Sequence, residues 1–510
     1  MLEKLYKKDA LMKQFALLVF LQPFIDIYRL FVGNTVEVAG VSLVELINII
    51  LIIYLAILFI LNQRKWKTFV PAILYSIILI IYLLLHSYNM LQFDTNIITG
   101  TSINVIVEAY VIIRAYVFPI MVLYMLLYMR TSEECFLKTI VGVSCFISCV
   151  IVVTNLLKVS YISYASNLEK NEMIHQNIIE WFTKNPPMDL NLITSKGWFY
   201  SGNQIGLILL MLFPIVIYYA IKNNRKRTYL LIVIQVVAMI MVATKTAALG
   251  SIVVMVIMIG LLILFGILYK KWKEYLKKAF VIAIILCCSI LLVQVSPVKK
   301  MIGLQELSYI SGQEEELKSE LEDFSSGELD TDEFSKFMYK YYYIYGIQEE
   351  YVKLFPVEKY PEFWLSVISD ENKSQANFRK FKKRIYTEVE KENANPKDEY
   401  LGIGYTTNFP YLEKDIIAQN VWFGKIGTIL LIGPFLIIFI IASVKILLNM
   451  KKKFNMFNCI LGLSICGGLG ASLLAGHLFG YFFPILIFAY IVAQLFQEVG
   501  TDNKDVKENK

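Results

Sequence analysis

The chain has 510 residues, of which 57% are hydrophobic and only 18% are charged, whereas soluble domains carry about 25% charged residues. So much apolar surface does not fit inside one globular core, which excludes an ordinary soluble protein and predicts a membrane protein. The formal net charge of +7 says less than the distribution of the charges. More than half of the 42 acidic residues fall between residues 297 and 420, whereas Lys and Arg concentrate in short loops between apolar runs.

Twelve apolar runs come close to the length of about 20 residues that a bilayer-spanning helix requires. They fall at 11–31, 41–61, 69–86, 104–129, 138–157, 198–221, 229–243, 246–269, 279–296, 422–446, 457–475 and 478–497. The first run lacks a small-residue cleavage site, so we expect it to remain as a span. The run at 229–243 is the shortest, and its boundary with the next run is the least defined.

The basic loops support this count. They lie at 62–67, 129–138, 222–228, 269–278 and 449–454, each after an even-numbered run. Twelve spans with both termini in the cytoplasm place every basic loop on the cytoplasmic side, as the positive-inside rule requires. The prediction is therefore an all-α, multi-pass protein of the cytoplasmic membrane with about 12 transmembrane helices.

Four regions follow from this pattern. Residues 1–296 carry transmembrane helices one to nine, 297–420 form a large extracytoplasmic loop, 421–498 carry helices ten to twelve, and 499–510 form a cytoplasmic tail. In the large loop, 304–324 is typical of a surface helix, 332–368 is rich in Tyr and Trp, and 377–400 predicts a charged helix followed by a loop. We expect this mostly helical loop to act as a lid over a reaction chamber and the polar tail to be disordered.

The cysteines and histidines do not indicate a metal or a disulfide framework. None of the seven cysteines lies in the large polar loop, and no CxxC motif occurs. The three histidines, His86, His175 and His477, are dispersed and lack an HExxH pattern. We expect no metal and no other cofactor.

Ionisable residues inside apolar runs are costly and indicate function by default. Asp26 and Arg29 share one helical face, so they are expected to pair. Arg114 lies about seven residues from the outer end of its run, which is too deep for its guanidinium to reach the surface comfortably. It is expected to face a cavity and an anion, or to be buried in an ion pair with Glu108 or another carboxylate.

The stretch ATKTAALG, residues 243–250, joins two runs with almost no loop. It places Lys245 at the start of a helix that Thr244 or Thr246 can cap. A helix N-terminus beside a lysine favours an anion, although an ordinary interfacial lysine fits as well. Asn203 opens an earlier run in SGNQIG and is either a substrate contact or an interface residue.

Three further residues are candidates for proton transfer. His477 lies in the tight turn between the last two runs, where it serves as a general base, a phosphate contact or a structural donor. Glu413 and Asp415 precede the tenth run, and either one acts as a base while the other orients it, or both stabilise the helix dipole.

Four stretches, taken in order, resemble the Wzy-like polysaccharide polymerases of the O-antigen ligase/polymerase superfamily. They are SGNQIGLILLMLFPIV, ATKTAALGSIVV, YLEKDIIAQNVWFGKIGTILLI and AGHLFGYFFPILIFAYI. The resemblance covers about residues 100–497, including the single large late outer loop. It implies a metal-independent glycosyltransferase of the GT-C type at the outer face of the cytoplasmic membrane. Its substrate would be an undecaprenyl-pyrophosphate-linked oligosaccharide, whose growing glycan is transferred to a new lipid-linked repeat unit.

The resemblance also implies roles for particular residues. It singles out Lys245, with the neighbouring Thr246, for the pyrophosphate, and Glu413, Asp415 and His477 for catalysis. Arg114 joins the pyrophosphate group because of its depth in the span, and Asn203 is expected to contact the substrate.

The expected partners are membrane lipids, a flippase and a chain-length regulator, and no nucleic acid. The alternatives are a ligase, although the HxxHN-like stretch of many ligases is missing, and a flippase or other transporter, although two repeat-related halves are not evident.

Overall fold

The structure is a computed structural model. It describes residues 7–32, 37–38, 41–63, 65–129, 131–164, 172–299, 317, 324, 330–343, 345, 347–369, 378–405 and 412–500. The surface helix expected at 304–324 lies outside these residues except for two positions, and the C-terminal tail lies outside them entirely. Two short strands, β1 (Glu37–Val38) and β2 (Val41–Ser42), pair antiparallel. The other regular elements of the described chain are helices.

Eleven helical segments of the described chain are long and apolar enough to cross a membrane, which confirms the all-α membrane fold. They are Lys8–Val32 (α2), Leu43–Asn62 (α3), Val70–Met90 (α4), Val105–Tyr128 (α5, η2 and α6), Glu133–Leu156 (α7), Gly202–Asn223 (α8), Lys245–Leu268 (α10), Trp272–Val295 (α11), Asp415–Leu448 (α19), Met456–Leu474 (α21) and Phe482–Gly500 (α22). The twelfth expected run is α9, Lys226–Val242, which has only 17 residues. That length is at the lower limit for a bilayer crossing.

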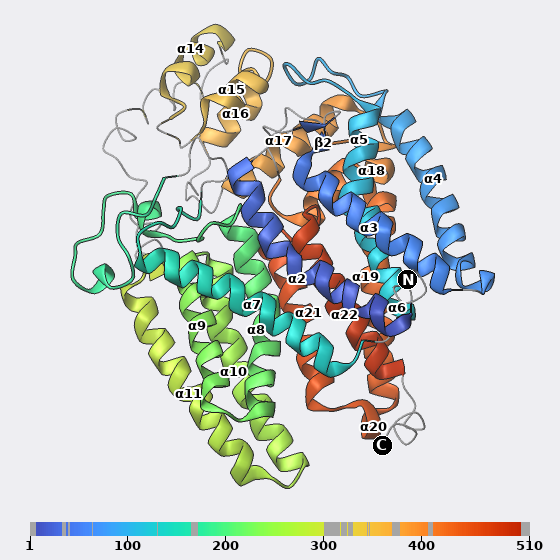
Figure 1. Cartoon of the computed structure of the whole chain (residues 1–510). Coiled ribbons are helices and arrows are strands. Elements are labelled where there is room, and N and C mark those ends of the chain that lie inside the picture. The colour runs from blue at the N-terminus through green and yellow to red at the C-terminus, as the bar shows by residue number, and fades with distance from the viewer. Residues whose placement is uncertain are drawn as a thin grey trace. The chain divides into compact units, whose positions relative to one another are not determined.

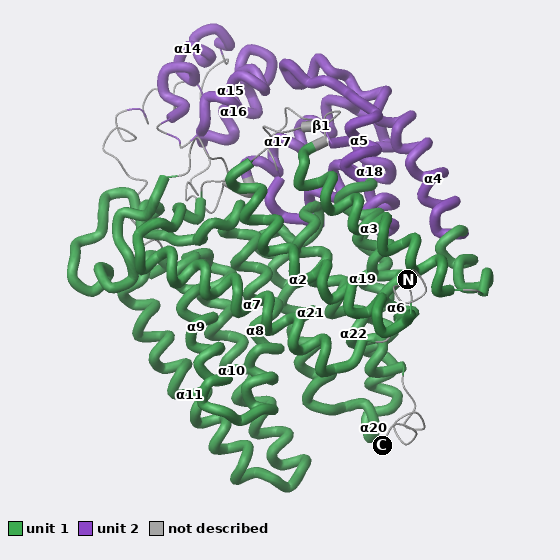
Figure 2. The backbone as a smooth tube through the Cα atoms, viewed as in Figure 1, with its two compact units in different colours: residues 1–73, 113–300, 431–510 green, residues 74–112, 301–430 purple. Residues whose placement is uncertain are grey.

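The chain forms two compact units, which Figure 2 distinguishes by colour. Unit 1 comprises residues 1–73, 113–300 and 431–510, and unit 2 comprises residues 74–112 and 301–430. Three of the four boundaries fall inside α4, inside α19, and between α5 (Val105–Ile112) and the π-helical turn η2 (Ile113–Val117), and the fourth follows residue 300. Unit 2 therefore includes most of α4, all of α5 and the start of α19 in addition to the large polar loop.

Helix α8 is the centre of unit 1. It packs against α7, α9, α10 and α21 (Figure 1), and its buried residues lie on all sides of the helix. A helix that is apolar all round is stable only when neighbouring helices surround it. By contrast, α11 buries only four residues, Ala279, Ile282, Ser289 and Val293, which is the pattern of a helix whose surface is left for lipid.

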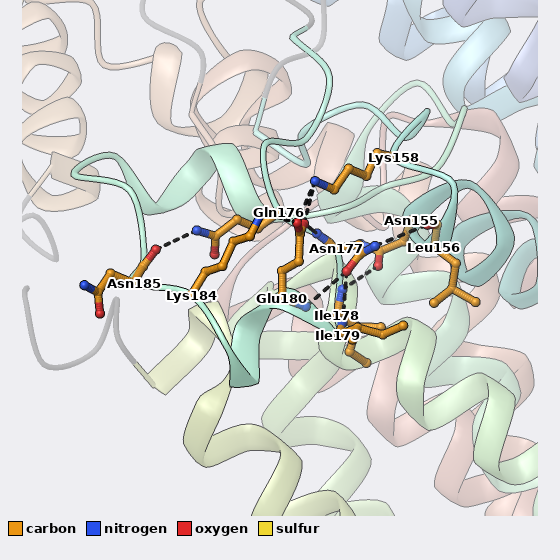
Figure 3. A network of polar contacts seen from close by, with 10 residues as sticks. All are labelled: Asn155, Leu156, Lys158, Gln176, Asn177, Ile178, Ile179, Glu180, Lys184 and Asn185. Carbon is orange, nitrogen blue, oxygen red and sulfur yellow. Dashed lines mark hydrogen bonds and ion pairs between the residues drawn. The ribbon is translucent and has the colours of Figure 1, made fainter.

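The loop between α7 and α8 in unit 1 has a defined structure built on polar contacts. Outside residues 165–171, which the structure does not describe, it contains two short helices, η4 (Glu180–Phe182) and η5 (Leu190–Ile193). Figure 3 shows Glu180 accepting from Lys158 at 2.8 Å and Lys184 at 2.5 Å. These lysines lower the pKa of Glu180 to about 2. Asn155 at the end of α7 accepts from the Ile178 amide at 2.9 Å, so the loop is tied to the helix that precedes it.

The described part of the polar segment in unit 2 contains five short helices. They are α14 (Thr331–Tyr341), α15 (Glu349–Leu354), α16 (Pro361–Ile368), α17 (Phe378–Asn393) and α18 (Asp398–Leu401). The charged helix expected after residue 377 is thus present as α17. Aromatic rings form the local core: Phe355 and Tyr360 stack with centroids 3.7 Å apart, and the indole of Trp364 donates to the Phe355 carbonyl at 2.9 Å. These rings are buried, so this part of the aromatic segment serves packing.

Candidate functional site

A pocket in unit 1 contains Arg114. The π-helical turn η2 carries Arg114, whose guanidinium forms an ion pair with Glu45 in the first turn of α3. The pocket is partly open to solvent and spans about 510 Å³ of empty space with that open solvent included, and its polar lining comprises Arg29, Glu45, Asn48, Arg114 and Tyr481. Arg114 therefore faces a cavity, as its depth predicted, and its carboxylate partner is Glu45 instead of Glu108.

A second arginine, Arg29 of α2 (Lys8–Val32), lines the same pocket. Its guanidinium carbon lies 4.2 Å from the centroid of the Tyr200 ring, a cation–π distance. Asp26, one helical turn earlier, accepts from the Tyr200 amide at 2.9 Å. The two residues that were expected to pair with each other are thus both in contact with Tyr200, just before α8.

The turn between α21 and α22 brings His477 and Asn203 together. The Asn203 amide donates to His477 Nε2 at 3.3 Å, so a neutral imidazole carries its proton on Nδ1. His477 itself has a positive φ of 73°, which is uncommon for a residue with a side chain and is found at functional sites. Its ring centroid lies 5.8 Å from that of Tyr481, which lines the arginine pocket. His477 therefore neighbours a residue of the pocket lining, and Asn203 contacts His477 in turn.

Lys245 begins helix α10, and Thr244 is the residue that caps it. The Thr244 hydroxyl accepts from the Ala247 amide at 3.2 Å. Gly206 of α8 makes room for this cap, because a Cβ at that position would lie 2.7 Å from the Thr244 hydroxyl oxygen. The Lys245 side chain is exposed and that of Thr246 is half-buried. Among the described residues, neither of them lines the arginine pocket.

Glu413 and Asp415 belong to unit 2. The Glu413 carboxylate lies 3.8 Å from the ammonium of Lys382, a distance that marks a loose ion pair. Asp415 is the first residue of α19 and is buried. Both positions agree with the plainer interpretation, in which acidic residues stabilise the start of a helix. Neither the contact of Glu413 with Lys382 nor the burial of Asp415 tests a catalytic role.

Unit 2 also holds a buried polar network that the sequence did not indicate. His86 of α4 contacts the Leu401 carbonyl through Nδ1 at 2.6 Å and Glu108 of α5 through Nε2 at 2.9 Å. The other oxygen of Glu108 accepts from the Tyr405 amide at 2.7 Å. This network fastens residues 401–405 to two helices of the same unit.

The same segment supports a break in helix α19. The backbone of Gly424 is non-helical, with φ 64° and ψ 179°. The amides of Ile403 and Gly404 donate to the carbonyls of Val421 and Trp422, and the Tyr82 hydroxyl donates to the Phe423 carbonyl. Carbonyls that lose their helical partners in an apolar environment need such substitutes.

Sequence comparison places the chain in a known protein family. A family model described as "O-antigen ligase like membrane protein" matches residues 8–501. The chain belongs to this family. No curated protein and no solved structure matches the chain, so the expected GT-C-like architecture stays a prediction. Membership implies a membrane enzyme superfamily that acts on lipid-linked glycans in O-antigen or polysaccharide assembly.

Four residues of the site were not singled out as site residues from the sequence. Glu45 and Tyr200 lie near the starts of apolar runs, and Lys196 lies near the end of a polar loop, positions at which hydropathy gives no signal. Arg29 was noticed only as a partner for Asp26. The available signal was the cost of placing a charge in a membrane helix, which pointed to Arg29 and not to the residues that support it.

Proposed function

We propose that this protein polymerises undecaprenyl-pyrophosphate-linked oligosaccharide repeat units into a surface polysaccharide of the capsule, exopolysaccharide or O-antigen type. The reaction would take place at the outer face of the cytoplasmic membrane, with both chain termini in the cytoplasm. The observation that carries the proposal is the pocket that two guanidinium groups line, in a chain whose family handles lipid-linked glycans.

The chemistry requires positive charge where the leaving group develops negative charge. In the proposed reaction the bond between the sugar C1 and the phosphate oxygen breaks, and a bond from C1 to an acceptor hydroxyl oxygen forms. The lipid pyrophosphate leaves as an anion. Arginine donates two parallel hydrogen bonds to a phosphate, so Arg29 and Arg114 suit this anion. Lys245 and Thr246, outside the pocket lining, are proposed to guide the lipid pyrophosphate toward it.

The acceptor hydroxyl has to lose a proton as the new bond forms. His477 is our preferred base because it neighbours Tyr481 of the arginine pocket, and Asn203 holds its Nε2 before the acceptor arrives. The lone pair on His477 Nε2 accepts from Asn203, so the acceptor hydroxyl must replace that amide before the proton can move. Glu413 and Asp415 remain second candidates for the base.

A reconstituted assay tests the proposal. The purified protein is incubated with a synthetic undecaprenyl-pyrophosphate-linked repeat unit, and the products are separated by length. The wild type is expected to give a ladder, whereas Arg114→Ala leaves single repeats unpolymerised. Arg227→Ala, which removes an exposed arginine in the first turn of α9, is the matched control and keeps the ladder. Normal chain lengths from Arg114→Ala would contradict the pyrophosphate role.

The same assay separates the alternatives. A ligase would move finished glycan only to a different acceptor and would give no ladder from repeat units alone. A flippase would move a labelled lipid-linked sugar across a vesicle membrane without joining two units. His477→Ala is expected to lower kcat by about 10²- to 10⁴-fold, the usual contribution of a general base, with a smaller effect on KM.

A further inference from the structure

The arginine pocket contains two cations in different electrostatic states. Arg114 is neutralised by its ion pair with Glu45. Among the described residues, no carboxylate forms an ion pair with Arg29, which lies over the ring of Tyr200 instead. The pocket lining, with two arginines and one glutamate, thus keeps one net positive charge. Arg29 also interacts electrostatically with Asp26, which does not line the pocket and whose carboxylate accepts from the Tyr200 amide.

A guanidinium that stacks on a ring is well prepared to bind an anion. Stacking uses the flat face of the group, so its edge N–H groups still point outward in the plane. The ring attracts the cation without neutralising its charge, whereas a carboxylate would compete with an incoming phosphate. The position of the Tyr200 ring therefore decides where Arg29 presents its donors.

Tyr200 is held by both of its backbone polar groups. Its amide donates to Asp26 Oδ2 at 2.9 Å, and its carbonyl accepts from Lys196 Nζ at 3.1 Å. The two side chains carry opposite charges and are almost fully buried, with relative exposures of 7% for Asp26 and 0% for Lys196. Burial lowers the pKa of Lys196 to about 8, against the opposing effect of the Asp26 carboxylate.

The loop that carries Lys196 is itself fixed. The Lys196 amide donates to the Tyr161 carbonyl at 3.0 Å, and the neighbouring Ser195 amide donates to the Met241 carbonyl at 2.8 Å. The Glu180 contacts in Figure 3 tie down an earlier part of the same loop. Burying a lysine side chain in a fixed loop costs free energy, and the hydrogen bond from Lys196 to the Tyr200 carbonyl is the interaction that this burial supports.

We propose that Arg29 is a second phosphate-binding residue of this pocket and that Asp26 and Lys196 position it through Tyr200. The ligand is the diphosphate of the lipid-linked substrate, so this inference rests on the proposed function. Arg29 would bind the substrate anion directly, whereas Tyr200, Asp26 and Lys196 are positioning residues that do not touch it.

Binding of inorganic pyrophosphate to the purified full-length protein tests the inference, with isothermal titration as the measurement. Arg29→Ala is expected to weaken binding by at least tenfold. Tyr200→Leu removes the ring and is expected to weaken binding by about tenfold, the usual worth of a desolvated cation–π contact. Tyr200→Phe keeps the ring and restores most of that loss. The exposed Arg227→Ala is the matched control for the loss of one positive charge.

A double-mutant cycle separates positioning from general damage to the fold. In an Arg29→Ala background, Tyr200→Leu and Lys196→Met should each have almost no further effect on pyrophosphate binding. If either variant weakens binding as much in that background as in the wild type, it does not act through Arg29 and the inference is wrong. Wild-type binding by Arg29→Ala would also overturn it.

The inference and the proposed function fail in different ways. If Arg29→Ala binds pyrophosphate normally while Arg114→Ala has lost long chains, the polymerase function stands and the role of Arg29 is refuted. If the binding pattern is as expected but the wild-type protein makes no polymer, the phosphate site stands and the polymerase function is refuted.

Discussion

The network around His86 and Glu108 gives the sharpest prediction for unit 2. The Leu401 carbonyl can only accept, so His86 Nδ1 must carry a proton, and the 2.9 Å contact from Nε2 to Glu108 then holds a second one. His86→Ala leaves the Leu401 carbonyl and one Glu108 oxygen without their partner. Removing one member of a buried pair costs about 3–5 kcal/mol. Since about 1.4 kcal/mol is a factor of ten, the segment should open at least a hundredfold more often.

Glu108→Gln is the matched variant because an amide can satisfy the same geometry. Its NH₂ group can donate to Nε2 of a neutral His86, its oxygen can accept from the Tyr405 amide, and Nδ1 can still donate to the Leu401 carbonyl. Every buried group then keeps a partner. We expect this variant to cost about 1 kcal/mol or less, the range of a single neutral hydrogen bond.

Amide hydrogen exchange at Tyr405 measures this opening directly, because that amide donates to Glu108. Exchange should be at least a hundredfold faster in His86→Ala and within about tenfold of the wild type in Glu108→Gln. Equal exchange in wild type and His86→Ala would refute the reasoning, because the pair would then not hold the segment. Equally fast exchange in both variants would show that charge, and not hydrogen-bond completeness, is the decisive property.

Three other predictions follow from particular contacts. Glu45→Gln removes the negative charge that competes for Arg114, so inorganic pyrophosphate should bind about tenfold more tightly in a titration, and weaker binding would contradict this. Gly424 has a positive φ, and Gly424→Ala places a Cβ 2.3 Å from the carbonyl carbon of Tyr400. In thermal unfolding this variant should be destabilised by roughly 1–3 kcal/mol or more. Gly260→Ala, whose Cβ meets open space, should leave the stability unchanged. The pKa of Glu180 is lowered from 4.5 to about 2, so the contribution of its carboxylate to stability is present above about pH 4.5 and is lost as the pH falls toward 2. Hydrogen exchange of the amides in its loop should accelerate over that pH range. Glu180→Gln should abolish this pH dependence of the exchange.

The sequence predicted the membrane fold well because hydropathy over about 20 residues is a strong physical signal. Eleven of the expected runs meet the length and hydropathy of a membrane span in the described residues, and the twelfth is present as α9, whose 17 residues are at the lower limit. The sequence also left two environments open for Arg114, a cavity or an ion pair with a carboxylate, because a charge deep in a membrane helix needs one of them, and Arg114 both lines a pocket and pairs with Glu45. The surface helix expected at 304–324, except for two positions, and the expected disordered tail lie outside the described residues.

The partners of these charges were harder to predict. Glu45 lies 69 residues before Arg114 and Tyr200 lies 174 residues after Asp26, so only the packing of separate helices and loops brings them together. Lys196 sits in a polar loop, where a lysine is unremarkable until its burial is known. The proposed division at residues 296 and 420 followed polarity alone, whereas the compact units also reflect buried contacts such as that of His86 with Leu401.

The π-helical turn at Ile113–Val117 makes the pocket sensitive to chain length. A π turn accommodates one more residue than an α-helical turn. The helical segments on either side keep their relative orientation because the wide turn absorbs the extra residue locally. Deleting one residue there would restore regular α geometry, and only the residues of the turn itself, Arg114 among them, would change position. The hydropathy of the segment would stay almost the same, so a one-residue difference at this turn changes the presentation of the arginine at the pocket without changing the hydropathy profile.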